Sequence, residues 1–360
     1  EEGKFVWELL DTPAQRWIDK GKYVAFRVSA TESWLYHATP KWVFDAGATG
    51  YDVEGHYLEP DYEDPVFIEK VENFLRAMAE RYDRNPHVAF VDVGHFGMWG
   101  EGHTVMSTPK HGRSWGLETQ KKHIDLYCKH FKNTQLCISD DFAGHDAPGS
   151  RFPITDYAFS RGVTIRDDSI LVQPPPHSWY HSEMAQLFWP TLPVILEHEH
   201  YGGSKERGSW DKNLLVKSVE DYHASFMSIH WWPRILLEVN RDAIDRMNRR
   251  ICYRLQVSGI SWPESVKMGE PLEIRSAWSN AGIVSALVVD DFDLRSLPVC
   301  EAGKTEERQI VSTFRIAPRY ADKAGTFFRA CKPGVYDLYV SAGMRDGTPV
   351  YELPYDGNDG

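Results

Sequence analysis

The sequence predicts an α/β protein: a (β/α)8 barrel over residues 1–257, followed by a small antiparallel β-sandwich over residues 258–360. Strand-like and helix-like segments alternate through the first region, which is typical of βαβ units around a parallel sheet. The strand candidates are nearly all apolar, as at residues 88–93, and this suits a sheet buried on both faces. No glycine-rich turn of the dinucleotide-binding kind follows a strand, so a barrel is favoured over an open doubly wound sheet.

Helices are predicted where apolar residues recur every three or four positions. In the first helix Leu9, Leu10, Trp17 and Ile18 follow this spacing, and Gly21 ends the pattern. Helices are expected over residues 6–20, 65–82, 117–131, 181–189, 214–225 and 242–255. Strands are expected over residues 22–29, 87–94, 135–139, 193–197 and 226–230, with a short strand near 41–43 and a weaker unit at 154–172.

From residue 259 the apolar runs become short and alternate with polar residues, as at residues 272–278 and 335–340. Glycine-containing turn signals separate them, which predicts the sandwich. The five cysteines show no metal-binding spacing, and a single Cys300–Cys331 bridge is left open.

Composition narrows the classes of partner. A net charge of −12 repels phosphate backbones, so we expect no nucleic acid partner. No apolar run approaches the roughly 18 residues that a membrane helix needs. The chain has 13 Trp residues, whose flat apolar faces suit sugar rings. We expect a secreted or periplasmic protein without a cofactor or metal.

The clearest site signal is the string Val93-Gly-His-Phe-Gly-Met-Trp-Gly-Glu101-Gly-His103, directly after a buried strand. Barrel active sites lie at the C-terminal ends of the strands. The glycines beside Glu101 permit close approach of a ligand, and Trp99 could form an apolar wall that raises the pKa of a general acid. The alternative is a structural Glu that caps the next helix.

A second signal is Pro193-Val-Ile-Leu-Glu197, followed by His198, Glu199 and His200. Strand alternation places Glu197 and Glu199 on one side and the two histidines on the other. Glu197 is preferred as the inward residue, with Glu199 in reserve. The alternatives are a structural role and a metal-dependent hydrolase that uses the histidines, although these lack the helical spacing of zinc proteases.

Two carboxylates on facing strand ends predict glycosidic bond cleavage, in which one protonates the leaving oxygen and the other attacks or activates water. Glu101 and Glu197 are therefore the predicted catalytic pair and a carbohydrate the predicted partner. For the supporting residues, surface pairing, helix capping, turn formation or plugging of the barrel mouth is the alternative. Substrate-binding roles are predicted for Arg27, Trp34, Trp99, His103, Asp140, Asp141, Glu199, His200, Trp231 and Trp232.

The pattern at Glu101 and Glu197 resembles the large clan of retaining (β/α)8-barrel glycoside hydrolases. There the acid/base Glu ends the fourth strand and the nucleophile Glu ends the seventh. The string Trp-Gly-Glu-Gly-His around Glu101 resembles a group related to family 42 β-galactosidases. The resemblance covers most of residues 1–257 and implies retention and a β-galactoside or algal galactan as substrate. Asn usually precedes the acid/base in the clan, whereas this chain has Gly100.

The opening Glu2-Gly-Lys-Phe-Val-Trp7 resembles the segment that follows the first barrel strand in such enzymes. The chain would then contain strands two to eight only, and an open barrel exposes unpaired edges. We therefore expect an N-terminal segment or a separate chain to supply the first strand. A non-catalytic glycan-binding barrel is the alternative function, because Gly100 removes a contact to the sugar.

Overall fold

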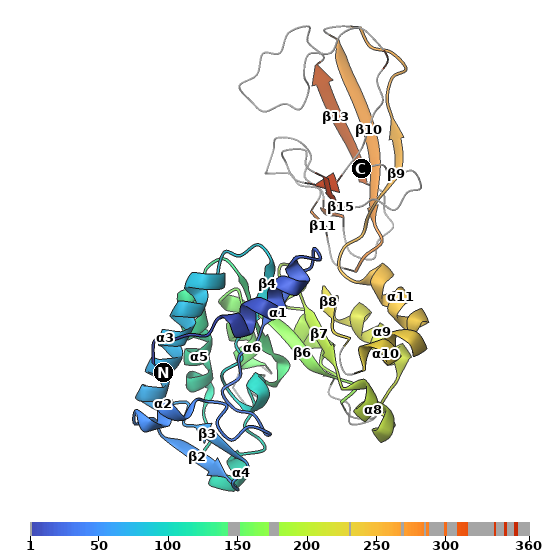
Figure 1. Ribbon diagram of the computed structural model, residues 1–360. Helices are drawn as coiled ribbons and strands as arrows, with labels where there is room; N and C mark the ends of the chain where they lie inside the picture. The colour runs from blue at the N-terminus through green and yellow to red at the C-terminus, as the bar shows by residue number, and fades with distance from the viewer. Residues whose placement is uncertain are drawn as a thin grey trace. The chain divides into compact units, whose positions relative to one another are not determined.

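The computed structural model describes residues 2–142, 152–172, 180–229, 232–267 and 270–283, residue 335, and short strand segments at 286–287, 299–300, 308–315, 342–343 and 349–351. The chain divides into two compact units (Figure 1). The first comprises residues 1–218 and 226–239, and the second comprises residues 219–225 and 240–360. The domain boundary between residues 257 and 258 stays a prediction.

The first unit is built on a six-stranded parallel sheet, whose strands follow one another in chain order. Between consecutive strands the chain passes through helices, as βαβ connections require. The predicted α/β class is confirmed. The strands are β1 (Val24–Phe26), β4 (Val88–Asp92), β5 (Gln135–Ser139), β6 (Thr164–Ile170), β7 (Ile195–His198) and β8 (Phe226–Met227).

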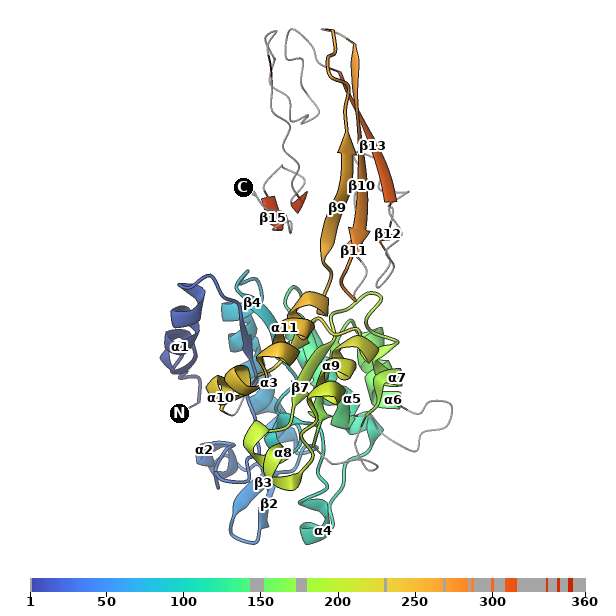
Figure 2. The same cartoon turned by 90° about the vertical axis from the view of Figure 1, so that its right-hand side faces the viewer.

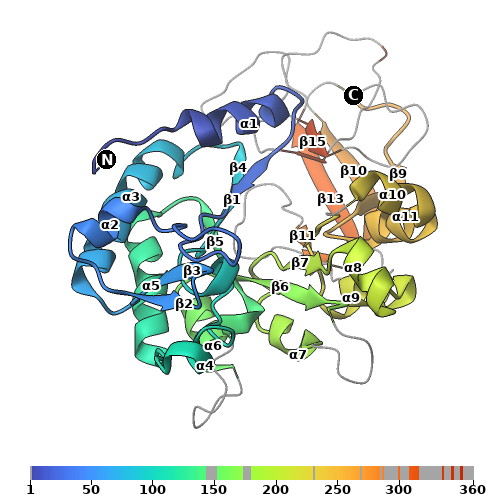
Figure 3. The same ribbon diagram turned by 60° about the horizontal axis from the view of Figure 1, so that its bottom comes forward.

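This sheet curls into part of a barrel. The rings of Phe90 in β4 and Phe226 in β8 lie 5.7 Å apart, although β5, β6 and β7 separate those strands in the sheet order. Figure 3 shows the strands as an arc with α3 and α5 outside it. The strands at the two edges are β1 and β8. Side chains on the inner face of the arc therefore converge from strands that are far apart in the sequence.

Helix α3 (Pro65–Tyr82) matches its prediction because its signals are local. The Asp64 side chain accepts hydrogen bonds from two backbone N–H groups of the first turn, and Pro65 occupies the first helical position. Phe67 and Leu75 lie on the buried face. The other helices of eight residues or more are α1 (Glu8–Ile18), α5 (Leu117–His130), α6 (Pro153–Ser160), α9 (Lys212–Asp221) and α11 (Arg241–Arg250).

The predicted strand at residues 41–43 is wrong, because this segment belongs to helix α2 (Lys41–Asp45). Three residues are too few to distinguish a period of two from a period of 3.6. The helix begins after Pro40, and Lys41 pairs with Asp45 one turn later. The arc therefore has one strand fewer than the seven expected. The hairpin of β2 (Gly50–Val53) and β3 (Tyr57–Pro60), which was not predicted, follows α2.

Short helices complete the first unit. They are α4 (Thr108–His111), α7 (Ser182–Ala185), α8 (Tyr201–Arg207) and α10 (Pro233–Val239), with the 3-10 turns η1 (Met98–Gly100) and η2 (Asp140–Phe142). The prediction at residues 181–189 overlaps α7, whereas α4, α8 and α10 were not predicted. Among the residues that the structure describes, no helix is long and apolar enough to cross a bilayer.

The second unit contains an antiparallel sheet in the order β13-β10-β9 (Figure 2). Its strands are β9 (Leu255–Ser261), β10 (Pro271–Asn280) and β13 (Arg308–Arg315); the pairs β11 (Ala286–Leu287) with β12 (Val299–Cys300) and β14 (Ala342–Gly343) with β15 (Pro349–Tyr351) are also antiparallel. The predicted strand at 272–278 lies within β10. Cys331 and most of the predicted strand at 335–340 lie outside the described residues, and the sandwich stays a prediction.

Asp83, directly after α3, should be a major local source of stability. Its Oδ1 accepts hydrogen bonds from the backbone N–H groups of Lys132, Asn133 and Thr134 at 3.0, 2.9 and 2.9 Å. Burial raises its pKa, but these hydrogen bonds outweigh burial and hold the pKa below its ordinary value. We predict that Asp83→Ala lowers the free energy of unfolding by about 2–3 kcal/mol, because it leaves these donors unpaired.

Chemical denaturation of Asp83→Ala and of Glu80→Ala, at an exposed position of α3, measures this effect. The advantage of Asp83 should be complete above its unfolded pKa of about 3.9 and be lost as the pH falls through the lower folded value. An equal loss of stability in both variants at neutral pH would contradict the prediction.

Candidate active site

The C-terminal ends of neighbouring strands bring charged side chains together on the inner face of the arc. In a parallel sheet the C-terminal ends of all strands lie at one edge, and the site was predicted at this edge. We call the set the carboxylate cluster. It comprises Arg27 after β1, Asp92 and Glu101 from β4 and its loop, Asp140 and Asp141 after β5, Arg166 and Asp168 in β6, and Glu197 in β7.

Arg27 joins the two predicted catalytic carboxylates. Its Nη1 lies 3.1 Å from Glu101 Oε1, and its Nη2 lies 3.6 Å from Glu197 Oε2. Because both nitrogens belong to one small planar guanidinium, the two carboxylate oxygens lie within about 9 Å of each other. The separation of about 5–5.5 Å in retaining glycosidases lies inside this limit, as does most of the range of about 6.5–9.5 Å in inverting ones. The predicted pair is therefore assembled across one guanidinium.

Arg166 is a second, deeper cation that sequence reasoning missed. Its side chain is 4% exposed, with Nη1 3.1 Å from Glu197 Oε2 and 2.5 Å from Asp168 Oδ2, and Nε 2.8 Å from Asp92 Oδ2. The sequence signal was the period-two spacing of Arg166 and Asp168 in a strand that looked weak because it is polar. Two positive charges thus lie beside Glu197 and stabilise its negative charge.

Glu101 has a different environment. Burial raises the pKa of Glu101 to about 8; the negative charges of Asp168 and Glu197 also raise it, while Arg166 and Arg27 lower it. The carboxyl group therefore stays largely protonated at neutral pH. Of the two predicted catalytic residues, Glu101 is suited to donate a proton and Glu197 to act as an anion.

The Glu101 loop depends on Gly100. This residue has a φ of 75°, and a Cβ built on it would lie 2.2 Å from the carbonyl oxygen of Gly94. No side chain fits there, so the Asn that usually precedes the acid/base in the resembled clan cannot be accommodated without moving the backbone. Trp99, at a φ of 54°, donates its backbone N–H to Thr31 and packs with Met98 against the β2–β3 hairpin.

His103 lies between Glu101 and Asp141. Its Nε2 is 3.9 Å from Glu101 Oε2 and 3.7 Å from Asp141 Oδ2. Among the described parts of the chain, these three residues form a group that could hold a metal ion, with ligand atoms within 4.8 Å of one another. Burial, followed by the charges of Asp168 and Asp167, raises the pKa of Asp141 to about 7. Sequence reasoning had placed the alternative metal site at His198 and His200 instead.

Asp140 is placed differently from Asp141. It is 3% exposed and accepts hydrogen bonds from Asp168 N at 3.0 Å and Ser169 Oγ at 2.8 Å. Burial and neighbouring carboxylates raise its pKa well above the ordinary value. These contacts make Asp140 a support for β6, in contrast to the predicted contact with sugar.

Glu199 and Glu197 have different partners, because β7 ends at His198 and strand alternation does not continue. The carboxylate of Glu199 lies 2.8 Å from Arg207 Nη2 in α8, and His200 is exposed. This arrangement favours Glu197 over the reserve candidate.

Two of the four predicted tryptophans, Trp34 and Trp232, lie at exposed positions. Trp34 is 74% exposed and follows Ser33, whose Oγ accepts a hydrogen bond from Trp99 Nε1 at 3.1 Å. Trp232 is 51% exposed, with its ring against Gly202. Trp231 lies outside the described residues.

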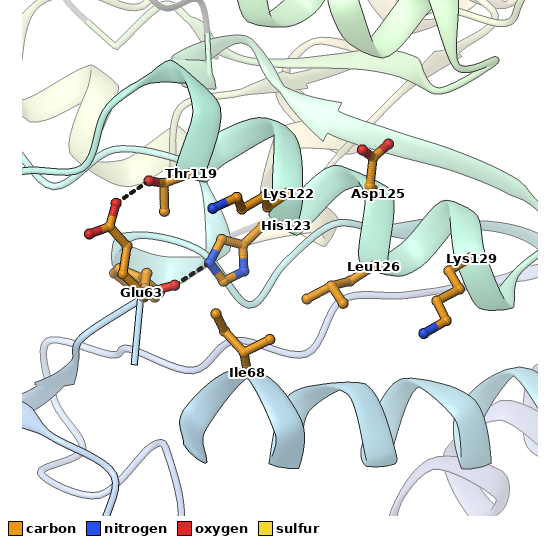
Figure 4. Close-up of a pocket in the computed structure, with 9 residues that line it drawn as sticks. Glu63, Ile68, Thr119, Lys122, His123, Asp125, Leu126 and Lys129 are labelled. Atoms are coloured by element: carbon orange, nitrogen blue, oxygen red, sulfur yellow. Dashed lines mark hydrogen bonds between the residues drawn. The ribbon is translucent and has the colours of Figure 1, made fainter. Parts of the chain in front are cut away.

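A cavity of about 580 Å³ lies between α3 and α5, apart from the carboxylate cluster (Figure 4). It shares no lining residue with that cluster. Its walls are Tyr62, Glu63, Ile68, Thr119, Lys122, His123, Asp125, Leu126 and Lys129.

The β-galactosidase family model of glycoside hydrolase family 42 matches residues 1–99. The chain is similar to glycoside hydrolases. The match confirms the family 42 resemblance over that segment, which ends just before Glu101, and supports the prediction of a glycoside hydrolase. No curated protein matches the chain.

Two solved structures of glycosidases are similar at low sequence identity. Endo-glycoceramidase II from Rhodococcus sp. is 14% identical, with a TM-score of 0.40, over 88% of this chain and 86% of that chain. A β-galactosidase from the psychrophilic Marinomonas ef1 is 13% identical, with a TM-score of 0.38, over 71% of this chain and 56% of that chain.

The charge of Asp168 should help to keep Glu101 protonated. We predict that Asp168→Asn lowers the pKa of Glu101 from about 8, because it removes the neighbouring negative charge that raises it most. NMR titration of ¹³C-labelled Glu carboxyl groups measures the shift. Glu199→Gln is the control, since that carboxylate pairs with Arg207. An unchanged Glu101 titration in Asp168→Asn would refute this electrostatic role.

Gly100 should tolerate a side chain far less well than Gly112. The two glycines have nearly equal φ angles of 75° and 74°, but a Cβ on Gly112 would meet no atom within 4 Å. We predict that Gly112→Ala costs about 1–2 kcal/mol of backbone strain. Gly100→Ala should cost a further 1–3 kcal/mol or so from the clash with Gly94. Equal losses on denaturant unfolding would show that the loop absorbs the methyl group.

Proposed function

We propose that this chain is a glycoside hydrolase that cleaves a glycosidic bond in an oligo- or polysaccharide with retention. Glu101 is the acid/base and Glu197 the nucleophile. The observation that carries the proposal is the contact of both carboxylates with Arg27, in surroundings that keep Glu101 protonated while Arg166 also contacts Glu197. Two carboxyl groups in opposite protonation states are what the reaction requires.

In the first step Glu101 donates its proton to the glycosidic oxygen while Glu197 attacks the anomeric carbon. The leaving group departs as an alcohol, and a glycosyl ester forms on Glu197. Arg27 Nη1, 3.1 Å from Glu101 Oε1, stabilises the carboxylate that remains after proton donation. Glu101 then removes a proton from water, which attacks the anomeric carbon and releases the sugar with its original configuration.

A β-galactoside is the proposed substrate class, with an algal galactan as the specific candidate. The name of the matched family supports the galactoside, and the resemblance of the Glu101 string supports the same group. Asp141 and His103 are proposed to contact sugar hydroxyl groups, because both lie near Glu101 and keep partly exposed side chains.

We also propose that further strands complete an eight-stranded barrel. The arc has six strands, two fewer than a closed (β/α)8 barrel, so the expected deficit of one strand becomes two. Large apolar side chains are exposed at both edges of the arc, namely Leu9 and Trp17 in α1, which contacts β1, and Phe226 in β8. A polypeptide segment packed on these edges would cover them. Separately, we propose that residues 258–360 form the β-sandwich expected from the sequence.

The nucleophile assignment predicts the outcome of Glu197→Ala. Turnover of aryl β-galactosides should fall by roughly 10³-fold or more, because no covalent intermediate can form. Azide should partly restore it by attacking the anomeric carbon, giving a glycosyl azide detectable by mass spectrometry. In Glu199→Gln azide should have no effect. Rescue in Glu199→Gln but not in Glu197→Ala would transfer the role to the reserve residue.

The acid assignment predicts how rate depends on leaving group and pH. Glu101→Gln should slow substrates with poor leaving groups by about 10²–10⁴-fold and good ones much less. In the unmodified protein kcat/KM should fall as the pH rises through about 8, because Glu101 loses its proton there. Binding without turnover across aryl glycosides and galactans would instead favour a glycan-binding module.

A further inference from the structure

We propose that His123, in helix α5 and outside the carboxylate cluster, is a positioning residue for Glu101 and acts through His95. The kinetic part of this inference rests on the proposed function. The structural part rests on a continuous set of contacts from Tyr62 to the Glu101 loop.

The Glu101 loop is packed backbone to backbone against the end of β4. Gly100 lies so close to Gly94 that a Cβ on it would be 2.2 Å from the Gly94 carbonyl oxygen. On the other side of Glu101, Gly102 N donates a hydrogen bond to Phe96 O at 3.0 Å. Gly100 and Gly102 flank Glu101 in the sequence, and Gly94 and Phe96 flank His95. The residues on both sides of Glu101 are therefore in contact with the residues on both sides of His95. A shift of His95 would therefore displace Glu101.

Two short hydrogen bonds connect the His95 side chain, through His123, to the backbone of Tyr62. His95 Nε2 lies 2.6 Å from His123 Nδ1, and His123 Nε2 lies 2.7 Å from the backbone oxygen of Tyr62, the second contact drawn in Figure 4. The Tyr62 oxygen can only accept, so His123 Nε2 carries a proton. In a neutral ring Nδ1 then accepts, and His95 Nε2 donates to it. The direction of every bond in the series is therefore determined.

Both rings are kept neutral by their surroundings. His95 is 5% exposed and His123 is 1% exposed. Burial lowers the pKa of His95 well below its ordinary value and that of His123 to about 4. Helix α5 makes a second contact with His95 through Tyr127, one turn after His123. The rings of Tyr127 and His95 are stacked, with their centroids 5.2 Å apart.

The pair is poorly suited to stability alone. With His95 Nε2 donating to His123, His95 Nδ1 is a buried acceptor, and it makes no hydrogen bond in the described structure. Leaving such an atom unpaired costs free energy that apolar rings of similar size would not cost. The hydrogen bond between His95 and His123 is present despite the free-energy cost of the unpaired Nδ1 atom. We therefore infer that this bond serves to place His95. His123 also lines the cavity between α3 and α5, whose lining includes no residue of the carboxylate cluster, so a substitution there removes no member of that cluster.

The kinetic test uses His123→Phe, which keeps an aromatic ring and removes both hydrogen bonds. With a misplaced acid, kcat/KM, which reports the first step, should fall about tenfold more for a phenyl β-galactoside than for a dinitrophenyl β-galactoside, because only the poorer leaving group depends on proton donation. KM should change little. His123→Asn, which retains a donor and an acceptor, should recover part of the loss. Leu126→Ala, in the same cavity wall, should leave the ratio between the two substrates unchanged.

The structural test does not need turnover. In His123→Phe the Glu101 carboxyl should titrate at a different pH from the unmodified protein by ¹³C NMR, and in Leu126→Ala it should not. An unchanged Glu101 titration, or an equal loss of kcat/KM for both substrates, would overturn the positioning role. If the unmodified protein hydrolyses none of the substrates while the titration shifts, only the proposed function fails. Should His123→Phe not fold, His123→Leu, which also removes both hydrogen bonds, is measured in the same way.

Discussion

The arrangement of the site depends on two guanidinium groups that hold mutually repelling carboxylates together. Arg27 and Arg166 share two acidic partners, Asp92 and Glu197. Arg27 also pairs with Glu101, and Arg166 also pairs with Asp168. Removing one partner from a buried ion pair typically costs about 3–5 kcal/mol, because a charge is left uncompensated. Arg166 is the more important of the two for this reason, since its side chain is almost completely buried.

The two arginines are placed differently relative to the carboxyl groups of Glu101 and Glu197. Glu197 contacts both arginines, whereas Glu101 contacts Arg27 but not Arg166, is itself largely buried and lies near the negative charges of Asp168 and Glu197. Proximity to cations and burial act in opposite directions on a carboxyl group. In the proposed mechanism, this difference in surroundings across one guanidinium separates the acid, Glu101, from the nucleophile, Glu197.

Precise placement of Glu101 depends on backbone packing as much as on charge. The glycines on either side of it allow the loop to lie directly on the end of β4, and α5 holds that end through His123 and Tyr127. Rigid support of this kind matters because proton donation requires a defined distance and direction. The absence of a side chain at Gly100, which looked like a departure from the resembled clan, is a requirement of this packing.

The sequence by itself determined the features that depend on local periodicity: the helices α3 and α5, the apolar strands β4 and β5, and the acidic residues that follow or end β4 and β7. Only the tertiary structure decided which charges meet. Arg166 and Asp168 were missed because polar residues on the inner face of a barrel strand interrupt the apolar pattern by which strands are recognised. The same limit applies to the His95–His123 pair. His95 lies in the turn after β4 and His123 in α5, and the two become neighbours only when α5 packs against the sheet.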